Sequence, residues 1–175
     1  MKRVSLKEVK QYLRQRSSDE LIRDIFDLFK RFDFVKDYYQ IRIMPESSEQ
    51  LVIKHKEMIL QEFFPSRGFG KARLSIARKA ITDYRKVSTS VEELADLMLF
   101  YVEMGVEYAT TFGDIKEEFY SSMEGMYLRA LKLIADNNLH DHFSSRCRQI
   151  IDDTSRIGWG FHENLFEVYV DVFRQ

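Results

Sequence analysis

The fold of this chain is decided by residues 90–113, which read SVEELADLMLFYVEMGVEYATTFG. Helical spacing makes most of the surface of this stretch apolar, through Leu94, Leu97, Met98, Phe100, Tyr101, Met104 and Tyr108. A helix that is apolar almost all round is usually enclosed by other elements. We therefore expect residues 91–112 to form the central helix of an all-α fold.

A narrow acidic stripe interrupts this apolar surface and consists of Glu92, Asp96, Glu103 and Glu107. Buried carboxylates without cations are very costly in free energy. We expect the stripe either to face solvent or a partner, or to pair with Arg and Lys side chains. The basic helix expected over residues 71–87 is a natural source of those cations, and a metal ion is the less favoured one.

Capping boxes mark several helix starts, because a Ser side chain and the Glu three residues later each accept an unpaired backbone N–H. Ser5–Glu8, Ser17–Glu20 and Ser90–Glu93 match the motif, Ser47–Gln50 follows Pro45 in the same manner, and Asp114–Glu117 is an acidic variant. The expected helices span residues 5–15, 18–31, 33–43, 47–63, 71–87, 91–112, 114–136, 139–156 and 161–173.

Short breaks separate these helices, which favours antiparallel neighbours. We predict eight or nine helices packed as antiparallel hairpins, in a bundle or a short superhelix, forming a single all-α domain over residues 1–175. Seven Gly and two Pro are too few for the frequent turns of a β-sandwich or barrel. A length of 175 residues with 45% hydrophobic residues suffices for one core without a metal or disulfide.

The cellular compartment is predicted from three features that the sequence lacks: a disulfide pair, a signal peptide and a membrane span. The single Cys147 cannot form an internal disulfide, and the charged N-terminus has no apolar stretch of a signal peptide behind it. The longest apolar run, Leu97–Val102, is far shorter than the roughly 20 residues of a membrane span. We expect a cytoplasmic protein with no membrane insertion.

Charge is unevenly distributed along the chain. Residues 1–90 hold 20 Lys and Arg against 12 Asp and Glu, whereas residues 91–175 hold 7 against 16. Such asymmetry marks either a surface for an oppositely charged partner or two halves that attract each other, within one chain or between copies. We favour the self-complementary interpretation.

The strongest candidate for binding is the basic face of the helix expected over residues 71–87. On a helix, Lys71, Arg78, Lys79, Arg85 and Lys86 fall within about 120° of one another, and Arg67 would lie near the helix N-terminus. This face suits the phosphates of a nucleic acid or of a small ligand. A solvated or internally paired helix face is the favoured alternative.

The residue patterns that could support catalysis are weaker than the basic face of residues 71–87. Glu103, Glu107, His140 and His142 are candidate ligands for a metal-dependent enzyme, but no His follows a Glu at the spacing of di-metal helical sites. Cys147 lies between Arg146 and Arg148, yet its spacing favours the apolar side of a helix, where Cys is inert. We expect no cofactor, no bound metal and no catalytic residue.

Three segments carry a resemblance to a known family. They are Ser5–Leu13, the Pro65, Gly68 and Lys71–Arg73 segment, and the Gly158–Trp159–Gly160–Phe161 turn, whose ring we expect to pack down. Together they resemble a bacterial family of small helical proteins of unknown function, over most of the chain. The resemblance implies an all-α fold and a bacterial origin, and it brings no catalytic residue.

We predict a non-catalytic protein-interaction or scaffold module, because polarised surfaces suit protein contacts and catalytic motifs are missing. A protein partner is expected, nucleic acid is the alternative partner, and self-association of the chain is compatible with its charge pattern. Binding of a nucleic acid or phosphate ligand through residues 71–87 and a metal-dependent enzyme are the two alternative functions.

Overall fold

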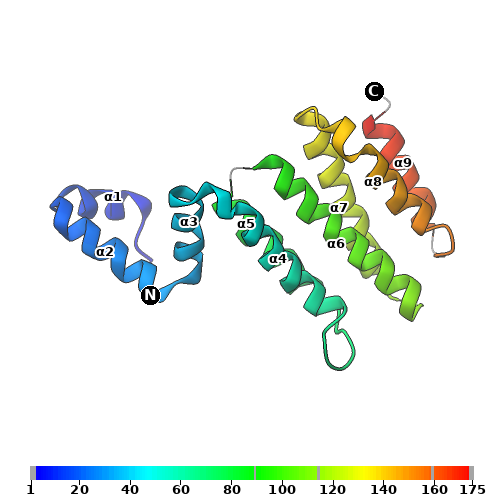
Figure 1. The fold of residues 1–175 in the computed structure, drawn as a ribbon, viewed down its shortest axis with the longest axis horizontal. Helices are drawn as coiled ribbons and strands as arrows, with labels where there is room; N and C mark the ends of the chain where they lie inside the picture. Colours follow the sequence, from blue (N-terminus) through cyan, green and yellow to red (C-terminus); the bar gives the residue numbers. More distant parts are fainter. Residues whose placement is uncertain (1–2, 89, 114, 159, 174–175) are drawn as a thin grey trace. The chain divides into compact units, whose positions relative to one another are not determined.

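The computed structural model describes residues 3–88, 90–113, 115–158 and 160–173. Within these ranges it contains nine α-helices, one short 3-10 helix and no strand (Figure 1), which confirms the all-α prediction. The chain divides into two compact units, residues 1–45 and 46–175. A single domain over residues 1–175 stays a prediction.

The N-terminal unit consists of three helices, α1 (Leu6–Arg14), α2 (Ser18–Arg31) and α3 (Asp33–Ile43). The capping boxes predicted at Ser5 and Ser17 are both complete, with each Ser hydroxyl accepting from the Glu backbone and each Glu carboxylate accepting from the Ser backbone. None of the three helices contains a buried residue. The local capping is therefore well formed, whereas the described residues 3–45 enclose no core.

The larger unit contains the hydrophobic core. After the 3-10 helix η1 (Pro45–Ser47) come α4 (Ser48–Phe63), α5 (Leu74–Val87), α6 (Val91–Phe112), α7 (Glu117–Asp136), α8 (His140–Asp153) and α9 (Phe161–Phe173). Helix α6 packs against α4, α5, α7 and α8, and successive helices lie side by side (Figure 1). The prediction that residues 91–112 form the central helix of the fold is confirmed.

A close approach between α6 and α7 fixes the centre of this core. A Cβ added to Gly105 would lie 2.0 Å from Sδ of Met123, so the absence of a side chain lets the two helices approach. Fully buried Phe63 lies edge-on to Tyr101 and to Phe119, with ring centroids 5.7 and 6.3 Å apart. Aromatic pairs of this geometry add to the free energy of burial.

The start of α5 differs from the prediction. The helix begins at Leu74, not at residue 71, because the preceding segment folds back on the end of α4. The backbone N–H of Ala72 donates to the carbonyl oxygen of Glu62 at 2.8 Å, and Ala72 has a positive φ of 43°. A Cβ on Gly70 would lie 1.7 Å from the carbonyl oxygen of Phe63, so only glycine fits this close approach.

Other predicted helix starts are only partly correct. Ser47 and Lys116 precede α4 and α7 without a side-chain cap, and α7 begins at Glu117 rather than at residue 114. Ser90 caps α6 by accepting from the N–H of Glu93, but the carboxylate of Glu93 does not return to Ser90. Asp114 and Trp159, with their predicted cap and turn, lie outside the described residues. Among the described helices, none has the length and apolar character needed to cross a membrane.

Candidate functional site

The six residues predicted for the basic face lie partly on α5 and partly before it. Lys71 precedes α5 and so does not lie on the predicted helical face, whereas Arg67 precedes the helix as predicted. Lys79 and Lys86 both bind the carboxylate of Asp83, with Lys86 Nζ 3.0 Å from Oδ1. Burial alone would raise the pKa of Asp83, but hydrogen bonds from these two lysines hold it below its usual value. Of the five residues predicted for the helical face, Lys71 therefore precedes the helix, and Lys79 and Lys86 share one carboxylate.

Arg78 is held in place by two polar side chains of neighbouring helices. Its Nη1 donates to the hydroxyl of Ser122 on α7 at 2.6 Å, and that hydroxyl lies 2.8 Å from the hydroxyl of Tyr101 on α6. Tyr101 is fully buried, and burial raises the pKa of its phenol. The guanidinium of Arg78 is thus fixed against α7, where it lines a groove.

This groove lies on α5, α6 and α7 and has a volume of 430 Å³. Its apolar lining comes from Ile81, Leu94, Met98, Met126 and Leu133, and its cationic lining from Arg78, Arg85, Arg129 and Lys132. Thr82 and Asp136 complete it. We call this site the basic groove. Two of its four cations, Arg78 and Arg85, were predicted from the sequence.

Arg129 and Lys132 were missed because they lie on a helix that the sequence marked only for its apolar face. Their spacing of three residues puts them on one side of α7, a signal that the sequence contains. Arg129, Lys132 and Arg85 are all exposed. Within the part of the chain that the structure describes, none of these three has an ion pair or a hydrogen-bond partner. Their charge is therefore available to a ligand.

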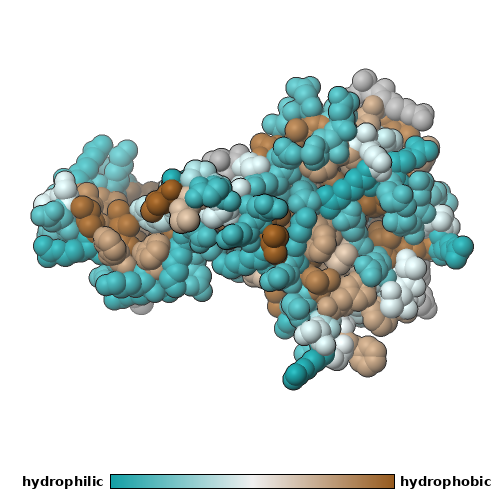
Figure 2. Space-filling model, viewed as in Figure 1, coloured by the Kyte–Doolittle hydropathy of each residue, from teal (hydrophilic) through white to brown (hydrophobic). Residues whose placement is uncertain are grey.

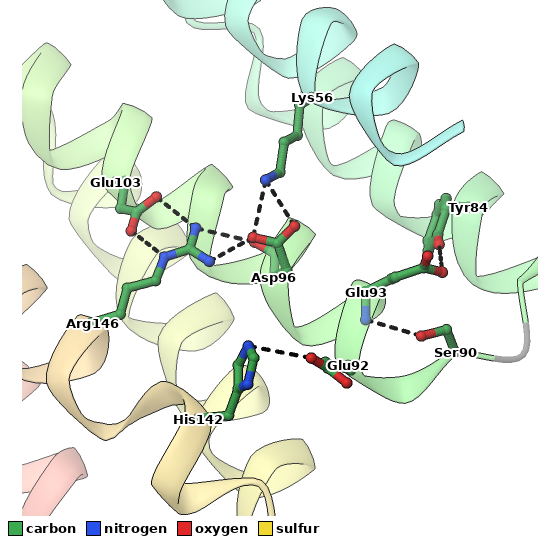
Figure 3. A network of polar contacts seen from close by, with 9 residues as sticks. All are labelled: Lys56, Tyr84, Ser90, Glu92, Glu93, Asp96, Glu103, His142 and Arg146. Atoms are coloured by element: carbon green, nitrogen blue, oxygen red, sulfur yellow. Dashed lines mark hydrogen bonds and ion pairs between the residues drawn. The ribbon is translucent and has the colours of Figure 1, made fainter. Parts of the chain in front are cut away.

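The acidic stripe forms ion pairs with two helices other than α5 (Figure 3). Asp96 accepts from Lys56 of α4 at 2.7 Å and from Nη1 of Arg146 of α8 at 2.5 Å. Arg146 also binds Glu103 with Nε and Nη2, at 2.6 and 2.8 Å. The prediction that Arg or Lys side chains pair with the stripe is confirmed for these two acids, but the expected source, the basic helix, is wrong.

The network centred on Arg146 is partly shielded from water. The side chains of Asp96, Glu103 and Arg146 are each between 25% and 28% exposed. Burial alone would lower the pKa of Arg146, yet hydrogen bonds to Glu103 and Asp96 raise it above its usual range. The guanidinium therefore stays charged and joins α6 to α8.

The two ends of the stripe are more exposed. Glu92 lies 3.2 Å from Nε2 of His142, and both side chains are more than half exposed. Glu107 is exposed and lines a hollow of 390 Å³ together with Glu103 and Asp153. The stripe thus changes from a structural network at its centre to a solvated surface at its ends.

Glu93, next to the stripe, has a separate structural role (Figure 3). Its carboxylate accepts from the hydroxyl of Tyr84 at 2.6 Å and from that of Ser48 at 2.7 Å. These contacts join α4, α5 and α6 at one end of the unit. Burial raises the pKa of Tyr84, with the hydrogen bond to Glu93 acting in the same direction.

The residues considered for metal binding or nucleophilic catalysis, such as His140 and Cys147, lie in surroundings that fit neither role. In the described ranges, no group of three or more His, Cys, Asp or Glu side chains is placed to hold a metal ion. His140 lies 4.6 Å from the ring of Phe173, measured between ring centroids. Cys147 is fully buried, and burial raises the pKa of its thiol to about 12. The apolar position predicted for Cys147 is confirmed.

Comparison with known proteins gives a family without an assigned activity. No curated protein and no solved structure matches the chain. The model of a family of unknown function, DUF6155, matches residues 4–174. This agrees with the resemblance to a helical family of unknown function, while a bacterial origin stays a prediction. Because the match spans nearly the whole chain, the protein belongs to the family of unknown function DUF6155.

Proposed function

We propose that this protein is a non-catalytic interaction module of the bacterial cytoplasm. It binds an acidic, apolar-faced helical segment of a partner protein in the basic groove. The proposal keeps the function class predicted from the sequence and moves the binding site from one face of α5 to a groove on three helices.

The observation that carries the proposal is the composition of the basic groove. Arg85, Arg129 and Lys132 are exposed cations without a partner among the described residues, and they surround an apolar lining that includes Met98 and Leu133. An amphipathic helix with acidic flanks offers the complementary arrangement, since its apolar side chains enter the groove and its carboxylates pair with the rim. Charge-assisted hydrogen bonds from arginine to carboxylate are stronger than hydrogen bonds between neutral groups.

Binding of nucleic acid or of a phosphate ligand through residues 71–87 is the alternative. It is less favoured because Lys79 and Lys86 both pair with Asp83, and because Lys71 precedes the helix. An apolar groove floor also contributes little to a phosphate backbone, whose binding depends mainly on charge.

The test measures fluorescence anisotropy of a labelled peptide with Leu at helical spacing on one face and Glu on both flanks. We expect saturable binding to the full chain. The double variant Arg129→Gln, Lys132→Gln is expected to weaken peptide binding about tenfold, because two charge-assisted contacts are lost. The matched control, Lys79→Gln with Lys86→Gln, removes the same charge outside the groove and is expected to leave binding unchanged.

A second variant separates a peptide from a phosphate ligand. Leu133→Asn removes apolar contact without changing charge, so it weakens peptide binding and leaves phosphate binding intact. The proposal is wrong if the peptide fails to bind, or if both double variants weaken binding equally. Tighter binding of a single-stranded oligonucleotide, with a steep salt dependence, favours the alternative.

A further inference from the structure

A pocket in the larger unit combines the hydroxyl of a buried tyrosine with the guanidinium of an exposed arginine. Hydrophilic and apolar residues are intermixed over the visible face of this unit (Figure 2), so a ligand site is recognised by its individual side chains. The pocket has a volume of 450 Å³, within the range of small-molecule sites. Its described lining comes from the end of α6, the first turn of α7 and residues 156–158 after α8.

Tyr120 of α7 is the buried polar residue of this pocket. It is only 5% exposed, and its ring centroid lies 5.7 Å from that of Phe119 and 5.1 Å from that of Phe161. Among the described residues, its hydroxyl has no hydrogen-bond partner. The hydroxyl is still accessible, because Nε of Arg16 is the only fully buried side-chain nitrogen or oxygen without a partner in the described ranges. The hydroxyl of Tyr120 therefore faces the pocket that this residue lines.

The other buried tyrosines all use their hydroxyls within the fold. Tyr84, Tyr101 and Tyr127 bond to Glu93, to Ser122 and to the backbone carbonyl oxygen of Cys147, respectively. Buried polar groups in proteins are nearly always paired in this manner. Tyr120 is the exception among the described buried tyrosines, and its hydroxyl is available to a ligand.

Arg156, which follows α8, supplies the charge of the pocket. It is exposed, and within the described part of the chain it has neither an ion pair nor a hydrogen-bond partner. It is also the only charged side chain among the described residues that line the pocket. The hydroxyl of Thr110 already donates to the carbonyl oxygen of Val106 at 2.9 Å. The side-chain donors left for a ligand are therefore Arg156 and Tyr120, and together they favour a negatively charged group.

A carboxylate is the negative group that this arrangement matches best. A guanidinium donates to both oxygens of a carboxylate at once, and a phenol hydroxyl donates one further hydrogen bond. A phosphate group carries close to two charges at neutral pH, which a single cation balances less well. Ala109 and Ile157 add apolar lining for the rest of the ligand.

We infer that this pocket binds a small apolar carboxylate, with Arg156 pairing with the carboxylate and Tyr120 donating a hydrogen bond to it. The pocket shares no described lining residue with the basic groove. The inference therefore goes beyond the proposed function and does not depend on it.

Benzoate is the probe for this site, and benzamide, which has nearly the same shape but no charge, is its control. In proton–nitrogen NMR spectra of the full chain, benzoate is expected to shift the amide signals of Gly113 and Gly158 saturably, with a millimolar dissociation constant. Benzamide is expected to bind about tenfold more weakly, because it lacks the charge-assisted bonds. Shifts confined to Gly125, which lies beside Arg129, would place benzoate in the basic groove and overturn the inference. Equal binding of benzamide, or no saturable shift, would overturn it as well.

Tyr120→Phe separates ligand binding from a structural role. It removes only a hydroxyl that has no partner among the described residues, so the thermal unfolding midpoint without ligand is expected to stay unchanged. Benzoate is expected to bind about fivefold more weakly, because one hydrogen bond is lost. Arg156→Gln is expected to weaken benzoate binding about tenfold, whereas the matched Arg148→Gln, on α8 outside the pocket, leaves it unchanged. Unchanged binding in either pocket variant contradicts the inference, as does tighter binding of inorganic phosphate than of benzoate.

Discussion

Arg146 of α8 and Glu103 of α6 form a two-pronged ion pair, with Nε 2.6 Å from Oε1 and Nη2 2.8 Å from Oε2. They are 43 residues apart in the sequence. The same guanidinium binds Asp96 with Nη1, and Lys56 supplies a second cation to Asp96, so two cations balance two acids of the central helix. This arrangement explains how a nearly all-apolar helix tolerates carboxylates on its surface.

Replacing Arg146→Met is expected to destabilise the protein by about 2 kcal/mol, because two partly buried carboxylates then lack most of their counter-charge. Urea unfolding followed by circular dichroism measures the free energy of unfolding. Arg148→Met is the matched control on the same helix. Its side chain is half exposed, and its distance to Asp152 is 3.9 Å, so we expect a change below about 0.5 kcal/mol. Equal losses from the two variants would contradict the role of the network.

The two glycines of the α6–α7 pair are expected to respond oppositely to alanine. Gly105→Ala puts a methyl group 2.0 Å from Sδ of buried Met123, and we expect a loss of about 2 kcal/mol. Gly125→Ala on α7 meets only Arg129 Nη2 at 3.5 Å, and we expect a gain of about 1 kcal/mol from helix propensity. Thermal unfolding of both variants checks the contrast. Met123→Ala combined with Gly105→Ala should recover part of the loss.

Cys147 is expected to be inert in the folded protein. Burial raises the pKa of its thiol to about 12, compared with an ordinary value near 8.5, so the thiolate fraction at pH 8 falls about a thousandfold. Labelling with a thiol-reactive disulfide reagent should therefore be slow in native protein and fast in denaturant. Rapid labelling under native conditions would show that the α8 face opens readily.

The capping boxes predict the response of the N-terminal unit to acid. Hydrogen bonds from the backbone and side chain of Ser17, and then from Arg16, lower the pKa of Glu20 below its ordinary value of 4.5. The stabilisation is therefore complete above pH 4.5 and is lost as the pH falls through the lowered pKa of the folded state. An NMR titration of the Glu20 carboxyl measures this pKa. Glu20→Gln should remove the dependence, and a normal pKa would contradict the capping geometry.

The local features of this chain can be predicted from the sequence because they depend on residues only a few positions apart. Ser5–Glu8 and Ser17–Glu20 close their capping boxes through backbone groups within one helical turn. The apolar side chains of residues 91–112 predict a central helix, since such a surface requires enclosure on most sides. The local interpretation failed at Lys71, where contacts with the end of α4 keep residues 70–73 out of the helix.

The sequence by itself determined the helical class, most helix bounds, the central position of α6 and the buried position of Cys147. Only the tertiary structure decided that Lys56 and Arg146 neutralise Asp96, and that Arg129 and Lys132 join Arg85 around one groove. Helical periodicity indicates which face of a helix is apolar, but not which other helix covers it. That choice depends on the shapes of side chains far apart in the sequence, such as Gly105 and Met123, whose close fit sets how α6 and α7 lie.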